Sequence, residues 1–210
     1  DFNYSSGEEI DEKTLDIPEK WILSRLSKTI DSYNYQLERF HFNEAAKILY
    51  EFTWTDFCDW YVEIAKLKFY GNDLESADIA RAVSISCLQT ILKLLHPFTP
   101  FITEELWQNF KPRNSGDLII SEWPIPLFYH NDRVESNMNK LKDIITSIRS
   151  VRSRMNIPNS KKIELIVKFN DNKKDFILGH LEVLKNFTKT KELSISSSNK
   201  KPINSATTVS

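Results

Sequence analysis

The chain has 210 residues, of which 40% are hydrophobic and 12% aromatic, and its formal net charge is −1. A chain of this length and composition can bury a sizeable core, which excludes a disordered or fibrous protein. Because the total charge is close to zero, binding to a polyanion would depend on local basic patches.

The N-terminal half predicts two amphipathic helices. Pro18 stands where a first helical turn tolerates proline, and apolar residues then recur at helical spacing up to about Phe40. Asn43 can cap a second helix, which the Gly-Asn-Asp sequence at 71–73 ends. The predicted buried stripe of this second helix is Ala46, Leu49, Thr53, Phe57, Trp60, Ile64 and Leu67.

Two more helices follow. The third runs from about Ser76 to Leu95 and ends before Pro97, because proline disfavours helical geometry in the residue that precedes it. Thr99 and Pro100 then begin a fourth helix as its cap and first position. A polar loop and a short extended piece at 118–123 lead to a fifth helix at 132–156.

The hydrophobic period changes after residue 158. Apolar and polar residues alternate over 162–169, which predicts a strand, and a helix at 175–187 and a second strand at 193–195 follow. The predicted fold class is therefore mainly α, an antiparallel helical bundle followed by a small α/β subdomain. The expected parts are a leading segment, the bundle and a subdomain that is truncated before its fold is complete, at residues 1–17, 18–157 and 158–210.

The sequence offers no catalytic constellation. Only four glycines are present, which excludes a P-loop and a dinucleotide fingerprint. The four histidines lack the spacing that lets two imidazoles hold one metal ion on a helical face, so no metal site is predicted. No catalytic triad can be recognised, because triads form in space and not along the sequence.

Neither a secretory signal nor a membrane span is predicted. Residues 1–12 are polar and acidic, and no later segment is apolar and long enough to cross a bilayer. Cys58 and Cys87 lie in helical patterns without a CxxC partner, so we expect reduced, packed thiols. The expected location is the cytoplasm.

A first basic patch lies on the first helix. Trp21 and Arg25 are one turn apart, so a flat ring and a flat guanidinium could be presented together, and unpaired RNA bases stack on such planes. Lys20 and Lys28 lie on the same flank. The alternative is that Trp21 covers the core and Arg25 forms an ordinary ion pair.

A second basic patch follows the fifth helix into the subdomain. Its members are Lys140, Lys142, Arg149, Arg152, Arg154, Lys161 and Lys162, with one acidic residue among them. Such a strip suits a phosphate backbone, and the alternative is a solvated helix face.

The sequence at 54–61 combines aromatic residues, a cysteine and two aspartates within about two helical turns. For Phe57, Cys58, Trp60 and Tyr61 we expect core packing, because their spacing is helical. Asp59 is expected to be a buried hydrogen-bond acceptor, since a carboxylate among aromatic rings must be paired to stay charged.

Five segments resemble valyl-tRNA synthetases. Residues 19–26 (EKWILSRL) are similar to the first helix of their anticodon-binding domain, and residues 42–54 (FNEAAKILYEFTW) continue into FCDWY at 57–61. Residues 148–158 resemble the helix before the small α/β unit of that family. The LHPFTPFITEELWQ sequence at 95–108 is shared more widely, among the Val, Ile and Leu enzymes.

The resemblance implies one part of a class I ligase that uses ATP and Mg²⁺ to attach valine to tRNA(Val). The HIGH and KMSKS motifs of the catalytic domain are absent from this sequence, so this part would bind tRNA and hold no cofactor itself. It also implies that residues 1–17 link to a catalytic body, and that the protein is a monomer that binds neither DNA nor a membrane.

Related enzymes present the first bundle helix to the anticodon, which implies base contacts by Trp21 and Arg25. Lys20 and Lys28 would then contact phosphate or sugar, and Trp123, on a loop beside the bundle, would be a further stacking platform. The backbone contacts would come from Lys140, Arg149, Arg152 and Arg154. Two alternatives are the same domain of isoleucyl-tRNA synthetase and a helical protein-interaction scaffold without RNA binding.

Overall fold

The structure is a computed structural model that describes residues 12–112, 114–126, 129–158, 160–168, 174–195 and 205–206. It divides into two compact units, Asp1–Glu135 and Ser136–Ser210. The division falls inside a long helix and so earlier than the boundary expected after residue 157. The last turns of that helix belong to the second unit, where Arg149 and Arg152 donate hydrogen bonds to the carbonyls of Phe187 and Thr188.

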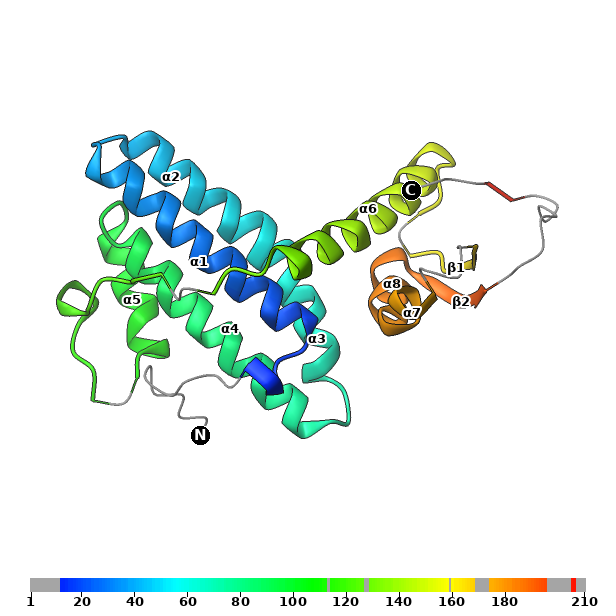
Figure 1. The fold of residues 1–210 in the computed structure, drawn as a ribbon, viewed down its shortest axis with the longest axis horizontal. Coiled ribbons are helices and arrows are strands. Elements are labelled where there is room, and N and C mark those ends of the chain that lie inside the picture. The colour runs from blue at the N-terminus through cyan, green and yellow to red at the C-terminus, as the bar shows by residue number, and fades with distance from the viewer. Residues whose placement is uncertain are drawn as a thin grey trace. The chain divides into compact units, whose positions relative to one another are not determined.

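The first unit is helical, as predicted. Figure 1 shows α1 and α2 side by side, with α4 packed along α1 and α5 beside α4. Its described elements are η1 (Glu12–Thr14), α1 (Ile17–Glu38), α2 (Phe42–Glu51), the π-helix η2 (Phe52–Val62), α3 (Glu63–Phe69), α4 (Leu74–Leu95), α5 (Pro100–Phe110), the 3-10 turn η3 (Leu118–Ile120) and the start of α6 (Asp132–Arg154).

Helix α1 supplies the centre of this bundle. Pro18 lies in its first turn, and most of the side chains from Trp21 to Ile30 are buried. Tyr33 is fully buried, and its hydroxyl donates a hydrogen bond of 2.6 Å to the carbonyl of Leu94 in α4. Burial raises the pKa of Tyr33 to about 12, so this donor keeps its proton at every physiological pH.

The second predicted helix is continuous, but its middle is π-helical, and this changes which residues are buried. The buried residues of the π-helix are Phe52, Asp56, Phe57 and Tyr61, and Tyr61 lies five residues after Asp56, which is the spacing of a π-helical turn. The predicted stripe is therefore wrong at Ala46, Thr53, Trp60 and Leu67, which are only partly buried. The expectation for Asp59 is also wrong, because that residue is exposed and Asp56 is the buried acid.

Helices α4 and α5 hold a smaller cluster. Trp107 packs with Leu92 and Leu118, and its indole N–H donates to the carbonyl of Gly116 over 3.1 Å. Glu104 accepts a hydrogen bond from the backbone N–H of Leu118. These contacts hold residues 118–120 as a 3-10 turn, where an extended piece was predicted.

Both cysteines are free thiols, as expected. Cys87 is fully buried in α4, and burial raises its pKa far above the ordinary value of a thiol. Cys58 is partly buried in the π-helix. A thiol that stays protonated in an apolar site is a packing group and a poor nucleophile.

The second unit is a small α/β arrangement, as predicted. Its elements are the remainder of α6, β1 (Ile163–Val167), α7 (Lys174–Gly179), α8 (Leu181–Thr188) and β2 (Thr190–Ile195). The strands are parallel, with Ile163 opposite Thr190 and Val167 opposite Ile195. The predicted single helix is two, because the chain leaves helical geometry at His180 between α7 and α8.

None of the helices in the described part of the chain combines the length and apolar content that a bilayer crossing requires. Within the same residues, no group of three or more His, Cys, Asp or Glu side chains is arranged to hold a metal ion. The order of helices and strands in the two units confirms the predicted fold class, a helical bundle with a small α/β part.

Candidate functional site

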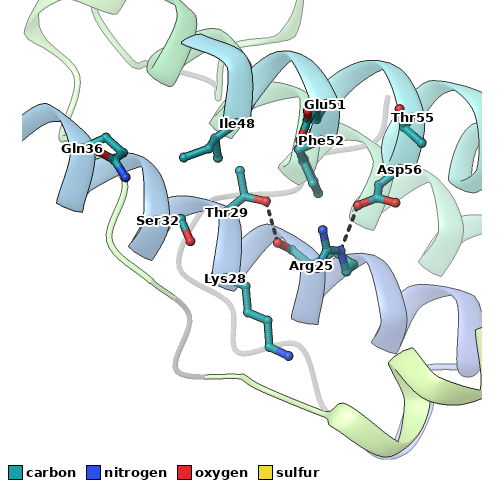
Figure 2. A pocket seen from close by; sticks show the side chains of 10 residues that line it. All are labelled: Arg25, Lys28, Thr29, Ser32, Gln36, Ile48, Glu51, Phe52, Thr55 and Asp56. Atoms are coloured by element: carbon teal, nitrogen blue, oxygen red, sulfur yellow. Dashed lines mark hydrogen bonds and ion pairs between the residues drawn. The ribbon is translucent and has the colours of Figure 1, made fainter. Parts of the chain in front are cut away.

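A pocket of about 650 Å³ lies between α1 and the α2–η2 segment, a size typical of ligand pockets. Figure 2 shows its floor on α1 and its other wall on the last turn of α2 and the π-helix. The lining is mixed, with two cations, two carboxylates, three hydroxyls, an amide and two apolar side chains. Its residues are Arg25, Lys28, Thr29, Ser32, Gln36, Ile48, Glu51, Phe52, Thr55 and Asp56.

Arg25 is held between two carboxylates at this pocket. Its Nε–H donates to Asp56 Oδ2 over 2.8 Å, and its Nη1 lies 3.6 Å from Glu135 Oε2. Burial alone would lower the pKa of Arg25, but the charges and hydrogen bonds of Asp56 and Glu135 outweigh it and raise the pKa. The side chain is still 37% exposed, so the guanidinium is both oriented and accessible.

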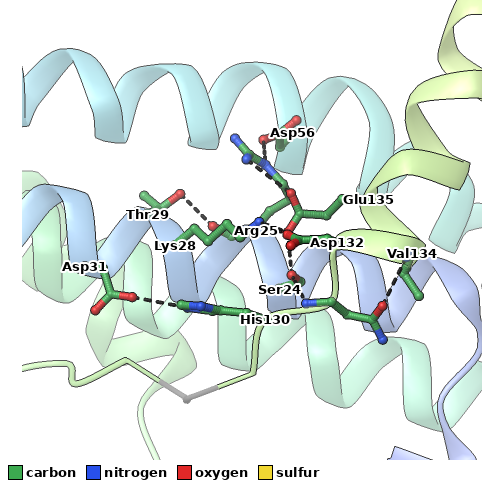
Figure 3. A network of polar contacts seen from close by, with 11 residues as sticks. Ser24, Arg25, Lys28, Thr29, Asp31, Asp56, His130, Asp132, Val134 and Glu135 are labelled. Atoms are coloured by element: carbon green, nitrogen blue, oxygen red, sulfur yellow. Dashed lines mark hydrogen bonds and ion pairs between the residues drawn. The ribbon is translucent and has the colours of Figure 1, made fainter.

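The first turn of α6 is attached to the same network (Figure 3). Ser24 donates to Glu135 and accepts from the backbone N–H of Asn131, and Lys28 Nζ lies 2.7 Å from Asp132 Oδ1 and 3.0 Å from Glu135 Oε1. Hydrogen bonds to Asp132 and Glu135 raise the pKa of Lys28. Four polar residues thereby fix the start of α6 on α1.

The structure corrects the prediction for Trp21. Its side chain is 1% exposed and belongs to the bundle core, so it offers no face to an unstacked base. Arg25 and Lys28 both form ion pairs with acidic residues. The structure therefore agrees with the alternative stated above, in which Trp21 belongs to the core and Arg25 forms an ion pair. Lys20 is partly buried on the same helix.

Trp123 is partly exposed and held in place by two contacts with α1. Its ring is 43% exposed and stacks on Tyr33 with centroids 6.2 Å apart. Its indole N–H donates to Asn34 Oδ1 over 3.0 Å, which fixes the orientation of the ring. Stacking of an RNA base on Trp123 stays a prediction.

A second aromatic group, at the turn between α1 and α2, was missed by the sequence reading. Phe40 is 77% exposed and Phe42 53% exposed, and their rings meet edge to face with centroids 6.2 Å apart. Arg39 stacks over the ring of Tyr35 at 3.5 Å. His41 Nδ1 lies 3.0 Å from Oε1 of Gln36, which also lines the pocket, so turn and pocket are joined.

Phe40 also has an unusual backbone. Its φ is 59°, in the left-handed region, which bulky residues seldom adopt and which costs on the order of 1 kcal/mol. A large apolar ring held in strained geometry and in solvent contributes little to folding. The signal in the sequence was the FHF at 40–42 between two helices, because a turn offers no packing partner for a side chain.

In the second unit the structure corrects the prediction for Arg152. Its side chain is buried, and its guanidinium donates to the carbonyls of Thr188, Pro158 and Lys161 over 2.7 to 3.1 Å. Arg152 therefore holds three chain segments together and is not available to a phosphate.

The other predicted backbone contacts do not form one strip. Arg149 donates from Nε to the carbonyl of Phe187 and stacks over its ring. Lys140 and Arg154 are exposed, but at 100° per residue they lie about half a turn away from Arg149 around α6. A single phosphate backbone cannot follow all of these side chains along the helix.

This arrangement offers groups that can bind a planar, polar ligand. In the described residues around the pocket, the carboxylates of Asp56 and Glu135 are engaged by Arg25, and the hydroxyl of Ser24 by Glu135. The accessible groups include the oriented guanidinium of Arg25, polar side chains of α1, the carboxylate of Glu51 and the exposed rings at the turn. Planar groups of this kind are typical of sites for unpaired bases.

Comparison with known sequences agrees with that chemistry. Residues 19–167 match the family described as "Anticodon-binding domain of tRNA ligase". The chain belongs to this family. The match covers both the bundle and the first strand of the second unit.

Named relatives are similar over most of the chain. The valine–tRNA ligase of Enterococcus faecalis is 38% identical over 187 residues, which cover 88% of this chain and 21% of that enzyme. The Geobacillus kaustophilus enzyme is 42% identical over 168 residues, covering 78% and 19%, and that of Bacillus subtilis is 40% identical over 153, covering 72% and 17%. The chain thus spans about a fifth of the length of these relatives.

Proposed function

We propose that this anticodon-binding domain is the part of a valine–tRNA ligase that holds the anticodon of tRNA(Val). The observation that carries the proposal is that Gln36 lines the α1–α2 pocket and also contacts His41, which lies between the exposed rings of Phe40 and Phe42 in the sequence. Membership of the family supports tRNA as the ligand class, and the names of the relatives support valine.

The chemistry of an anticodon loop fits these groups. Its unpaired bases expose flat faces, which stack on aromatic rings, and polar edges, which need fixed donors and acceptors. Phe40 and Phe42 supply the faces, and Arg25 and Gln36 supply polar groups inside the pocket. Asp56 and Glu135 orient the guanidinium, so less conformational entropy is lost when it donates to a base.

In the intact ligase that we propose, ATP and Mg²⁺ would serve the activation of valine. We assign that chemistry to other parts of the ligase, because this sequence carries neither the HIGH nor the KMSKS motif. A cytoplasmic, monomeric protein remains our expectation. The isoleucine enzyme is the less favoured assignment, because the relatives above are named for valine.

The proposal predicts that RNA affinity falls when the aromatic rings of the α1–α2 turn are removed. It predicts no loss when an exposed ring elsewhere in the bundle is removed. We expect Phe40→Ala/Phe42→Ala to weaken binding of valine tRNA by about 10-fold or more, since stacking contributes roughly 1–3 kcal/mol per base. The measurement is fluorescence anisotropy of labelled tRNA. The matched control is Phe101→Ala on α5, where the ring is 91% exposed, and it should bind as the parent does.

Two further readouts sharpen this test. A valine tRNA with a changed middle anticodon base should bind the parent more weakly, and the double variant should discriminate less between the two RNAs. Equal affinity of the parent for both tRNAs would refute anticodon reading. Affinity that hardly depends on salt would instead favour the protein-interaction scaffold, because phosphate contacts weaken steeply as salt rises.

A further inference from the structure

The two compact units carry opposite net charge. Residues 1–135 contain 13 Lys and Arg against 23 Asp and Glu, a net charge of −10, whereas residues 136–210 contain 15 against 6, a net charge of +9. The near-neutral total conceals this separation. A polyanion is therefore repelled on average by the first unit and attracted by the second.

Part of this positive charge gathers where the two strands begin. The backbone N–H of Ile163 donates to the carbonyl of Lys189 over 3.1 Å, and Ile163 is paired with Thr190. The residues just before each strand are therefore neighbours. The exposed lysines of this end are Lys161, Lys162, Lys189 and Lys191, which we name the strand-start cluster.

Local backbone geometry separates these lysines from the sheet. Ile163 is paired with Thr190 and Glu164 with Glu192, so Lys191 is an extra residue without a partner in the register, which is a β-bulge. Lys189 has a φ of 51° at the end of α8. The side chains of Glu164 and Glu192 are exposed one register step further along, and they are the nearest described acids along these strands.

Arg152 fixes both segments of the cluster. Its Nη2 donates to the carbonyl of Lys161, and its Nη1 to the carbonyl of Thr188, next to Lys189. One buried guanidinium thus positions the lysines of both strands through their backbone. Four exposed like charges held together raise the energy of the folded chain, and an anionic ligand relieves that repulsion.

We propose that the strand-start cluster binds the phosphate backbone of RNA and supplies a sequence-independent share of the affinity for tRNA. The proposal rests on the proposed function, since it takes tRNA as the ligand. Lysine is a point charge that suits a phosphate without fixed geometry, and residues 160–162 and 188–192 contain no aromatic side chain on which a base could stack. The cluster therefore contributes affinity but no base discrimination.

The test uses the whole 210-residue chain with Lys162→Gln/Lys189→Gln. Both side chains are exposed, and the carbonyl of Lys189 accepts the hydrogen bond from the backbone N–H of Ile163, which the substitution leaves in place. We expect roughly 10-fold weaker binding of valine tRNA at 100 mM salt. The slope of log K against log salt should fall by about 1.5, because each lost phosphate contact lowers it by roughly 0.7–0.9.

The matched control is Lys168→Gln/Lys185→Gln, which removes the same charge from the same unit. Lys168 follows the last residue of β1, roughly 20 Å along the strand from Lys162, and the charge of Lys185 in α8 is already paired with Glu182 over 2.9 Å. The control should retain most of the affinity. Circular dichroism of each variant should match that of the parent.

The outcomes separate the two proposals. If the parent discriminates between anticodons but both double variants lose equal affinity, or neither does, the strand-start cluster is not a binding surface. If the cluster variant loses affinity while the parent ignores the anticodon, the inference holds and the proposed function fails. Polyglutamate that competes as well as RNA at equal charge would overturn the inference in favour of an acidic protein partner.

Discussion

Arg25 in the bundle and Arg152 in the α/β unit were read from the sequence as the same kind of residue, a cation for RNA, and the structure gives them different roles. Arg25 is bonded to carboxylates at the edge of a pocket and keeps 37% of its side chain exposed. Arg152 is bonded to three backbone carbonyls and is 4% exposed. The partners of an arginine, and not its neighbours in sequence, decide whether it is available to a ligand.

Replacing the buried arginine should have the largest effect on stability. Arg152→Met keeps much of the side-chain volume but leaves three carbonyls without their donor, so we expect a loss of about 3 kcal/mol in the free energy of unfolding of the second unit. Urea unfolding, followed by a probe in that unit, measures it. A loss below about 0.5 kcal/mol would mean that water replaces the guanidinium and that the comparison with Arg25 is wrong.

The corresponding change at the pocket should cost less. Asp56→Asn keeps a hydrogen-bond acceptor for Arg25 but removes the charge, and we expect a loss of about 1 kcal/mol because the guanidinium is partly exposed to solvent. Glu51→Gln, on the exposed wall of the same pocket, is the control for charge alone. Thermal unfolding of the two variants gives the difference, and equal effects would show that the Arg25–Asp56 pair is not special.

The weakest effect belongs to the ion pair of Lys28 with Asp132, which stands at the surface beside Arg25. The hydrogen bond from Lys28 lowers the pKa of Asp132, so the stabilisation is present above the unfolded pKa of about 4 and is lost as the pH falls through the lower folded value. The pKa of Lys28 is raised, so its share is present below about pH 10 and is lost above that.

Unfolding of Lys28→Met and of the parent should therefore differ by a constant amount between pH 5 and pH 9, and the difference should shrink below about pH 4. A difference that does not change with pH would mean that Lys28 acts by packing its methylene groups. No comparable pH dependence is expected for Arg152→Met, because its partners are carbonyls that do not titrate.

The binding tests extend the same comparison. The bundle should lose affinity when Phe40 and Phe42 are changed, and should then discriminate less between anticodons. The second unit should lose affinity when Lys162 and Lys189 are changed, with no change in discrimination. If the lysine variant lost anticodon discrimination and the phenylalanine variant kept it, base recognition and phosphate binding would not be divided between the two units in this way.

Much of the fold could be read from local sequence rules. Helix starts at Pro18 and Pro100, the stop before Pro97 and the alternation after residue 162 each depend on a few neighbouring residues, and the structure has the corresponding elements. The predicted core nature of Phe57 and Tyr61 is confirmed for the same reason. Short segments such as FCDWY were enough to predict membership of the anticodon-binding family.

Tertiary packing decided the rest. In the π-helical segment Asp56 is buried and Asp59 exposed, and in the folded bundle Phe40 and Phe42 lie outside the core while Trp21 lies inside it. A helical period says which residues share a face, because that follows from backbone geometry alone. Which face is covered, and which partner an arginine finds there, depends on segments far away in the sequence, so only the folded chain settles it.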